Sequence, residues 1–256
     1  MGRALKYDIP GVDRRVSCDE VREKGWPAIF EPDLARPPVA AAQPRRGAAS
    51  PPSSWSAGRS PAQGERSAGP RQTPPFPLVV EIGFGRGEFL RDLAARAPGV
   101  AHVGIEYSGK RVLKMARRLA RLEVKNVRLL QAPAERVVRE LLPPASVAAF
   151  WINFPDPWPK KRHQRRRLLQ APFVGELAVR LAPGGSLHVA TDHADYAEQI
   201  DAALAGEPRL ENAFAPERFL REVPERMPTA YELEWRAEGR ALHFWHYRRP
   251  GPPASA

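Results

Sequence analysis

From Leu78 to Arg249, short apolar runs alternate with stretches whose apolar residues recur at helical spacing. The apolar runs predict strands near 78–82, 101–106, 127–131, 146–152 and 185–191, and the stretches between them predict helices near 86–97, 108–122, 134–142, 166–181 and 193–204. Such alternation builds a parallel sheet with helices on both faces. Two more extended runs are expected near 230–236 and 240–248, where a closing hairpin would add an antiparallel edge. The expected fold is one doubly wound α/β domain.

The chain before this domain has a different composition. Residues 32–77 contain 11 prolines, and the only large apolar side chains between positions 35 and 75 are Val39 and Trp55. Such a segment cannot bury enough surface to offset its ordering entropy, so it is expected to be a disordered linker. Residues 1–31 are expected to form an arm that packs on the domain at 78–249. Residues 250–256 are expected to be a disordered tail.

The charge and the cysteine count limit the classes of function. Lys and Arg total 40 against 29 Asp and Glu, a formal charge of +11, which suggests a polyanionic partner. The single cysteine excludes a disulfide framework and argues against a metal site. The longest apolar runs are far shorter than the ~20 residues that span a bilayer, and no apolar leader is seen. We therefore expect a cytoplasmic protein without a membrane or metal partner.

A glycine-rich turn joins the first expected strand to the first expected helix. It reads Gly83-Phe-Gly85-Arg-Gly87, a G-x-G-x-G spacing, because position 88 is Glu. Glycines there let the backbone approach a ligand and leave the helix N-terminus open to a negatively charged group. The spacing disfavours a dinucleotide and suits S-adenosylmethionine, which has one carboxylate and an adenosine. Glu81 resembles the acidic residue that begins this motif in class I methyltransferases.

Glu106 ends the second expected strand. A carboxylate at this position can accept hydrogen bonds from both hydroxyls of a ribose, although a helix-capping or solvated acid would look the same in the sequence. The glycine turn and Glu106 together favour binding of S-adenosylmethionine.

The fourth expected strand leads into a proline-rich segment that begins Asn153-Phe-Pro-Asp156-Pro-Trp158. Switch-point geometry places this segment beside the ligand crevice, and Trp158 offers a flat face for a base. Asp156 is expected to lie where the methyl acceptor meets the methyl donor. Six of the eight residues at 160–167 are Lys or Arg. The order of acid, proline and aromatic residue looks like the acceptor loop of nitrogen methyltransferases.

The longer string, F-P-D-P-W-P-K-K-R-H-x-x-R-R-L, closely resembles the signature of the bacterial tRNA (guanine-N7-)-methyltransferase family. The resemblance continues in Ala190-Thr-Asp192 and in Thr229-Ala-Tyr-Glu232, and covers about Leu78 to Arg249. It implies a Rossmann-like class I fold with a mostly parallel seven-stranded sheet and an antiparallel C-terminal edge. It also implies methyl transfer from S-adenosylmethionine to N7 of a guanine in tRNA, in the variable loop.

The resemblance implies roles for further residues. Asp156 would contact the cofactor, orient the guanine and stabilise the positive charge that the purine acquires, without removing a proton. Lys160, Asp192, Thr229 and Glu232 would hold the RNA. One position departs from the family pattern, because Pro133 stands where the family has an acidic residue near the adenine. Adenine contact would then depend on backbone groups such as the Ala134 N–H.

Two other functions stay open at this point. An amino-group methyltransferase acting on DNA or RNA is expected to have a second proline at the position of Trp158. An RNA-binding protein without catalysis is favoured by Pro133 and opposed by Asp156 and the glycine turn. The sequence leaves open whether the protein is a monomer or a homodimer.

Overall fold

The computed structural model describes residues 8–34 and 76–251. Most of the expected linker at 32–77 and most of the expected tail at 250–256 lie outside the described residues, so these two expectations stay untested. The described part contains the whole run of expected strands and helices from Leu78 onward.

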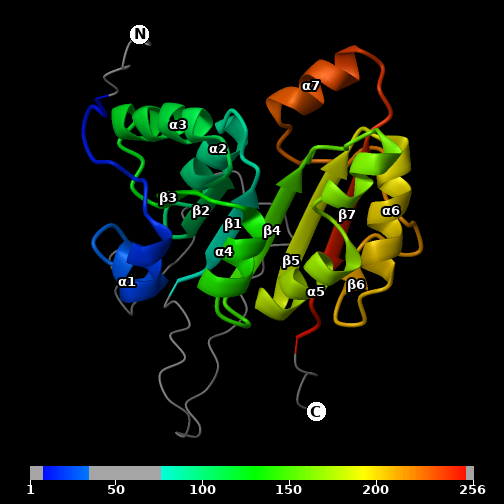
Figure 1. Cartoon of the computed structure of the whole chain (residues 1–256), viewed down its shortest axis with the longest axis horizontal. Helices are drawn as coiled ribbons and strands as arrows, with labels where there is room; N and C mark the ends of the chain where they lie inside the picture. Colours follow the sequence, from blue (N-terminus) through cyan, green and yellow to red (C-terminus); the bar gives the residue numbers. More distant parts are fainter. Residues whose placement is uncertain (1–7, 35–75, 252–256) are drawn as a thin grey trace, which may run out of the picture.

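A seven-stranded sheet in the order β3-β2-β1-β4-β5-β7-β6 forms the centre of the domain (Figure 1). Its strands are β1 (Leu78–Ile82), β2 (Ala101–Glu106), β3 (Val127–Gln131), β4 (Val147–Asn153), β5 (Leu181–Thr191), β6 (Glu211–Asn212) and β7 (His243–Arg248). Strands β1 to β5 are parallel, whereas β7 runs antiparallel to both β5 and β6. The predicted mostly parallel sheet with an antiparallel C-terminal edge is confirmed.

Helices cover both faces of the sheet. They are α1 (Cys18–Phe30), α2 (Glu88–Arg96), α3 (Gly109–Arg121), α4 (Ala134–Leu141), α5 (Ala171–Arg180), α6 (Ala194–Ala205) and α7 (Ala230–Ala237). Successive side chains of β1 point to opposite faces: Val80 belongs to a core with α1, α4, α5 and α6, whereas Val79 packs against α2. Because both faces are buried, the central strands are mostly apolar, with buried polar residues such as Glu81, His102 and Arg128 among the apolar ones, and this is why the strands were readable in the sequence.

The N-terminal arm packs on the domain and covers the edge of the sheet. Trp26 and Phe30 of α1 are buried in the main core, and the indole of Trp26 donates to the Leu141 carbonyl (2.7 Å). The chain before α1 pairs with β3, because Val16 N–H donates to the Leu129 carbonyl (3.0 Å). The arm thus occupies hydrogen-bonding groups of a strand that would otherwise be an open edge.

The expected extended run at 230–236 is wrong, because this segment is helix α7. Thr229 and Glu232 form a reciprocal capping box, in which each side chain accepts a hydrogen bond from the backbone N–H of the other. The alternation of Tyr231, Leu233 and Trp235 suggested a strand, but Leu233 is exposed and the two aromatic rings stack one helical turn apart. The antiparallel edge is built by β6 and β7 instead.

The topology places several loops at one end of the sheet. Ile82 at the end of β1 pairs with Ile105 of β2 on one side and with Ile152 of β4 on the other. The chain order reverses at β1, so the loops after β1 and β4 separate and leave a crevice at the carboxyl ends of these strands. Helix α7 lies above this end (Figure 1).

Candidate active site

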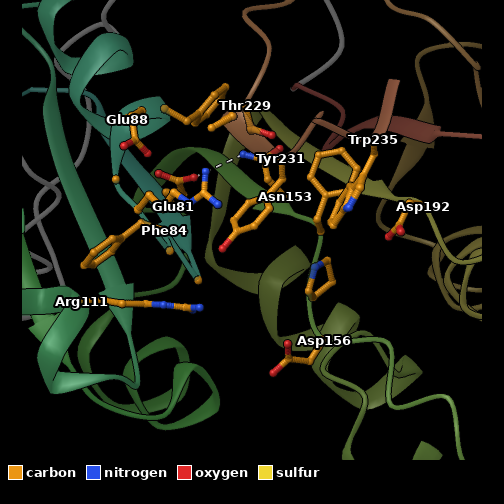
Figure 2. A pocket seen from close by; sticks show the side chains of 18 of the residues that line it. Glu81, Phe84, Glu88, Arg111, Asn153, Asp156, Asp192, Thr229, Tyr231 and Trp235 are labelled. Atoms are coloured by element: carbon orange, nitrogen blue, oxygen red, sulfur yellow. Dashed lines mark hydrogen bonds between the residues drawn. The ribbon is translucent and has the colours of Figure 1, made fainter. Parts of the chain in front are cut away.

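A cavity of about 290 Å³ lies at this switch point. Its walls come from the glycine turn after β1, the segment after β4, the segment after β5, and the start of α7. Figure 2 shows Phe84 and Glu88 on one side, Trp235 and Asp192 on the other, and Glu81 and Asn153 between them. Segments separated by some 150 residues in the sequence therefore meet around one space.

The glycine turn wraps tightly at the amino end of α2. Gly83, Gly85 and Gly87 have φ values of 74°, 55° and 80°, a region that side chains rarely adopt. At Gly87 there is also no room, since an added Cβ would lie 2.4 Å from the sulfur of Met115. All three glycines line the cavity, as predicted for residues that let a ligand approach the backbone.

Glu106 fixes this turn from the end of β2. Its Oε2 accepts from the Gly85 N–H (3.1 Å), its Oε1 accepts from the Ser108 N–H (2.9 Å), and the Arg111 guanidinium lies 3.6 Å away. The carboxylate is buried and does not itself line the cavity. Each carboxylate oxygen has a second lone pair, so Glu106 can hold the turn and still accept from a ligand. The next residue, Tyr107, is 78% exposed.

Glu81 is the deepest acid of the cavity. Asn153 Nδ2 donates to its Oε1 (3.3 Å), while the buried Oε2 has no hydrogen-bond partner among the described residues. Burial raises the pKa of Glu81 to about 8, although the Asn153 hydrogen bond and the nearby Arg226 charge act in the opposite direction. An unsatisfied buried carboxyl oxygen at a cavity wall is a site for a positively charged or hydrogen-bond-donating group.

Glu81 should make stability fall with rising pH. Between pH 4.5 and 8 the native state keeps the Glu81 proton and the unfolded state releases it, so raising the pH favours unfolding. The free energy of unfolding is expected to fall by on the order of 1.4 kcal/mol per unit of pKa difference, a few kcal/mol in all. We expect Glu81→Gln to remove this pH dependence. Urea unfolding at pH 5 and pH 8, with Glu135→Gln as an exposed control, measures the effect. Parallel pH dependences of wild type and Glu81→Gln would contradict it.

The segment after β4 carries the predicted acceptor acid. Asp156 lines the cavity and is exposed to it. Trp158 is not brought to the cavity, contrary to the expectation that its face meets a base. Its ring lies under the Arg166 guanidinium (5.0 Å) and against the edge of His163 (5.7 Å).

Arg167 holds this segment in place through hydrogen bonds. Its buried guanidinium donates to the Pro157 carbonyl (2.8 Å), to Gln199 (2.9 Å) and to Asp195 (2.5 Å). One member of the basic run at 160–167 is thus structural. The run forms a 3₁₀ helix at Lys161–Arg166, so the helix expected to begin at 166 begins only at Ala171.

The predicted RNA-contacting residues lie in different settings. Asp192 lines the cavity and accepts from Arg240 (2.9 Å), and Thr229 lines it as the N-cap of α7. Glu232 is buried below the cavity wall, where it accepts from Arg226 and Arg236. Lys160 is exposed just before the 3₁₀ helix and does not line the cavity.

Pro133 and Ala134 also lie outside the cavity lining. They begin α4 after β3, with Pro133 as the N-cap in an extended conformation. Strand β3 is separated from β1 by β2, so these residues are adjacent to the Glu106 end of the site rather than to Asp156.

Several cavity residues were given no role by the sequence reasoning. Asn153 links Glu81 to Arg226, because its Oδ1 accepts from Arg226 (2.6 Å) while its Nδ2 donates to Glu81. Tyr231 and Arg86 also line the cavity. Asn153 and Tyr231 lie inside or beside the sequence motifs, and this position was the signal that could have identified them. The sequence offered no signal for Arg226, because its contact with Asn153, 73 residues away in the chain, forms only on folding.

Neither a metal-binding cluster nor a membrane-spanning helix is found in the part of the chain that the structure describes. Across residues 8–34 and 76–251, no group of three or more His, Cys, Asp or Glu side chains is arranged to hold a metal ion. In the same ranges, no helix is both long and apolar enough to cross a membrane.

Residues 75–245 match the family model Methyltransf_4, described as "Putative methyltransferase". A tRNA (guanine-N(7)-)-methyltransferase of Geobacter metallireducens is 37% identical over 70% of this chain and 85% of its own length. One of Alkalilimnicola ehrlichii is 40% identical over 69% and 74%. One of Bordetella pertussis is 48% identical, although the match spans only 54% of that relative. The crystal structure of the 16S rRNA methyltransferase KamB has a similar fold (TM-score 0.51, 18% identity, 68% of this chain and 88% of that one).

Proposed function

The chain belongs to the tRNA (guanine-N7-)-methyltransferase family, and from that membership we propose how its cavity transfers a methyl group from S-adenosylmethionine to N7 of a guanine in tRNA. The observation that carries the proposal is the meeting of the glycine turn, the Asp156 segment and the start of α7 around one cavity. The family relation makes the chain an enzyme that depends on S-adenosylmethionine. The assignment of roles to individual residues is our proposal.

The glycine-turn side of the cavity fits the cofactor. The unsatisfied Oε2 of Glu81 suits the ammonium group of a methionine moiety, whose positive charge would lower the pKa that burial raises and favour the ionised carboxylate. The glycine turn leaves backbone close to the ligand. Glu106 would accept from the ribose hydroxyls, with Tyr107 beside it for the adenine. Pro133 and the Ala134 N–H would border the adenine on the far side of β2. S-adenosylmethionine supplies a methyl group on a positively charged sulfur.

Asp156 is placed for the chemistry of the acceptor. Guanine N7 has an in-ring lone pair and no proton, so it needs no general base. It needs alignment with the methyl carbon and stabilisation of the positive charge that forms on the purine. A carboxylate in the cavity serves the second need, and it can accept from the guanine N–H groups. We therefore assign Asp156 an orienting and electrostatic role at the border between cofactor and guanine.

The opposite wall would receive the RNA. Asp192 and Thr229 line the cavity there, and Glu232 supports Thr229 by capping the same helix turn. Lys160 would contact a phosphate at the entrance. Exposed basic residues of α3, the helix that follows the carboxyl end of β2, add positive charge, which attracts an RNA backbone without reading its sequence. These exposed residues are Lys110, Arg111, Lys114 and Arg121.

Two broader properties follow from the proposed substrate. A tRNA-modifying enzyme works where tRNA is made, so we propose a cytoplasmic protein. Its N7 target is proposed to lie in the variable loop, where a guanine edge is accessible in folded tRNA. Whether the enzyme acts as a monomer or a homodimer is a question for sedimentation measurements.

Methyl transfer from labelled S-adenosylmethionine to an unmodified tRNA transcript tests the proposal. We expect the label in 7-methylguanosine, and no label when the variable-loop guanine is replaced by 7-deazaguanine, which has carbon in place of N7. Label in a base methylated on its amino group would instead support the amino-group alternative. Tight tRNA binding with no label in any nucleoside would support an RNA-binding protein without catalysis.

A further inference from the structure

Tyr231 lies in the cavity wall where the acceptor is expected, and planar side chains lie against its ring. Its ring stacks with Trp235, one helical turn further on, with 5.4 Å between centroids and 26° between planes. The Arg86 guanidinium also covers the Tyr231 ring, 4.8 Å from its centroid. Arg86 belongs to the glycine turn, so this contact crosses from one wall of the cavity to the other.

Among the other aromatic side chains of the cavity, Trp235 is also covered by a cation, the Arg240 guanidinium at 5.5 Å, but Arg240 is held by ion pairs with both Asp192 and Glu238. The remaining rings do not offer a face. Phe84 and Phe89 are buried in the cores between the sheet and the helices α2 and α3. Phe154 packs edge-on against Trp235, at 4.7 Å and 75°. The cover of Tyr231, the Arg86 side chain, is 48% exposed, and the ion pair that holds it among the described residues is with Glu234 alone.

The cover on Tyr231 is easy to displace. Arg86 is held by an ion pair with Glu234 (2.6 Å), and both side chains are about half exposed. Ion pairs of this kind contribute little, since water can replace either partner. A planar ligand entering the cavity can thus take the place of the guanidinium over the ring.

We propose that the ring of Tyr231, supported by Trp235, is the stacking platform for the target guanine, and that it stabilises the positively charged purine formed by methylation. This inference rests on the proposed function. The ring is already covered by a planar cation, the guanidinium of Arg86, and aromatic faces attract planar cations. Trp158, the aromatic residue of the acceptor loop, is covered by Arg166 away from the cavity and does not serve this purpose.

The platform acts on the reaction through the charge it faces. When the lone pair of N7 forms the new C–N bond, the electron pair of the broken C–S bond stays on sulfur, so the positive charge passes to the purine and no proton is released. The guanine is neutral before the reaction and cationic after it. An aromatic face therefore binds the transition state more strongly than the substrate, which raises kcat rather than only lowering KM.

Two variants test the platform. We expect Tyr231→Leu to lower kcat for tRNA methylation by about 10-fold, with an unchanged KM for S-adenosylmethionine, and Tyr231→Phe to keep a rate close to wild type. Tyr231→Met repeats the test with a longer apolar side chain, so a folding defect in one variant does not decide the result. Leu233→Ala on the same helix, a change at an exposed residue outside the cavity, is the matched control.

A binding measurement without turnover gives a second readout. Quenching of tryptophan fluorescence by 7-methylguanosine 5′-monophosphate and by GMP reports on the ring stack that includes Trp235. We expect the wild type and Tyr231→Phe to bind the methylated, cationic nucleotide about 10-fold more tightly, and Tyr231→Leu to lose this preference. An unchanged preference or an unchanged kcat in Tyr231→Leu would overturn the platform. Absence of 7-methylguanosine with the wild-type enzyme would instead overturn the proposed function.

Discussion

Replacing Asp156 with alanine is expected to lower kcat for tRNA methylation by about 100- to 1,000-fold. The carboxylate lines the cavity after β4, opposite the glycine turn that would hold the cofactor. Removing a preorganised group that faces developing charge in a closed site costs on the order of 100- to 1,000-fold in rate. Because Asp156 is proposed to orient the acceptor without removing a proton, the rate of the remaining activity should show no new dependence on pH.

The size of this effect is measured by single-turnover transfer from labelled S-adenosylmethionine, with nucleoside analysis of the product. Asp156→Asn keeps one acceptor oxygen and loses the charge, so it should lie between the wild type and the alanine variant. Glu217→Ala, which removes an exposed acid far from the cavity, is the control. A rate for Asp156→Ala within a factor of three of wild type would show that the charge is stabilised elsewhere.

Replacing Glu106 with alanine is expected to weaken S-adenosylmethionine binding by about 100-fold. The side chain accepts from two backbone N–H groups, at Gly85 and Ser108, and so fixes the turn that approaches the ligand. It would also accept from the ribose. Hydrogen bonds to a charged group contribute about 1.5–3 kcal/mol each, so losing a ligand contact and the order of the turn accounts for roughly two orders of magnitude.

Calorimetric titration with S-adenosylhomocysteine measures this loss without turnover. Glu106→Gln replaces one carboxylate oxygen with an NH2 group, which donates and cannot accept, and it should lose part of the affinity. Glu135→Ala, an exposed acid in the first turn of α4, should bind as the wild type does. Equal affinities for Glu106→Ala and wild type would show that the ribose is held by other groups.

The sequence was sufficient for the sheet because its central strands are buried on both faces. Such strands are mostly apolar, so β1, β2, β3 and β4 stood out as short apolar runs, although β1, β2 and β3 each contain at least one buried polar residue. The segment at 230–236 was misread because Tyr231, Leu233 and Trp235 alternate with polar residues, as the side chains of a half-buried strand do. The capping box of Thr229 and Glu232 was visible as a spacing, and it determined a helix.

The individual chemical groups of the site could also be read from the sequence. Each depends on its own residue type and its neighbours: glycines that tolerate positive φ, an acid at the end of a strand, and a proline-stiffened acceptor loop. These are local properties, which can be read directly from the sequence. Asp156 and the glycine turn were found in this way, Glu81 was found from its resemblance to the acid that begins the class I methyltransferase motif, and the structure brings them around one cavity.

What only the tertiary structure decided is which groups face one another. Arg226 and Asn153 are 73 residues apart, and Tyr231 and Arg86 belong to opposite walls of the cavity. The folded sheet, the switch point at β1 and the placement of α7 determine these contacts, and no local spacing encodes them. The raised pKa of Glu81 has the same origin, because burial is a property of the assembled core. The sequence by itself determined most of the elements and the candidate residues of the site, whereas their mutual distances, burial and charge environment came only with the fold.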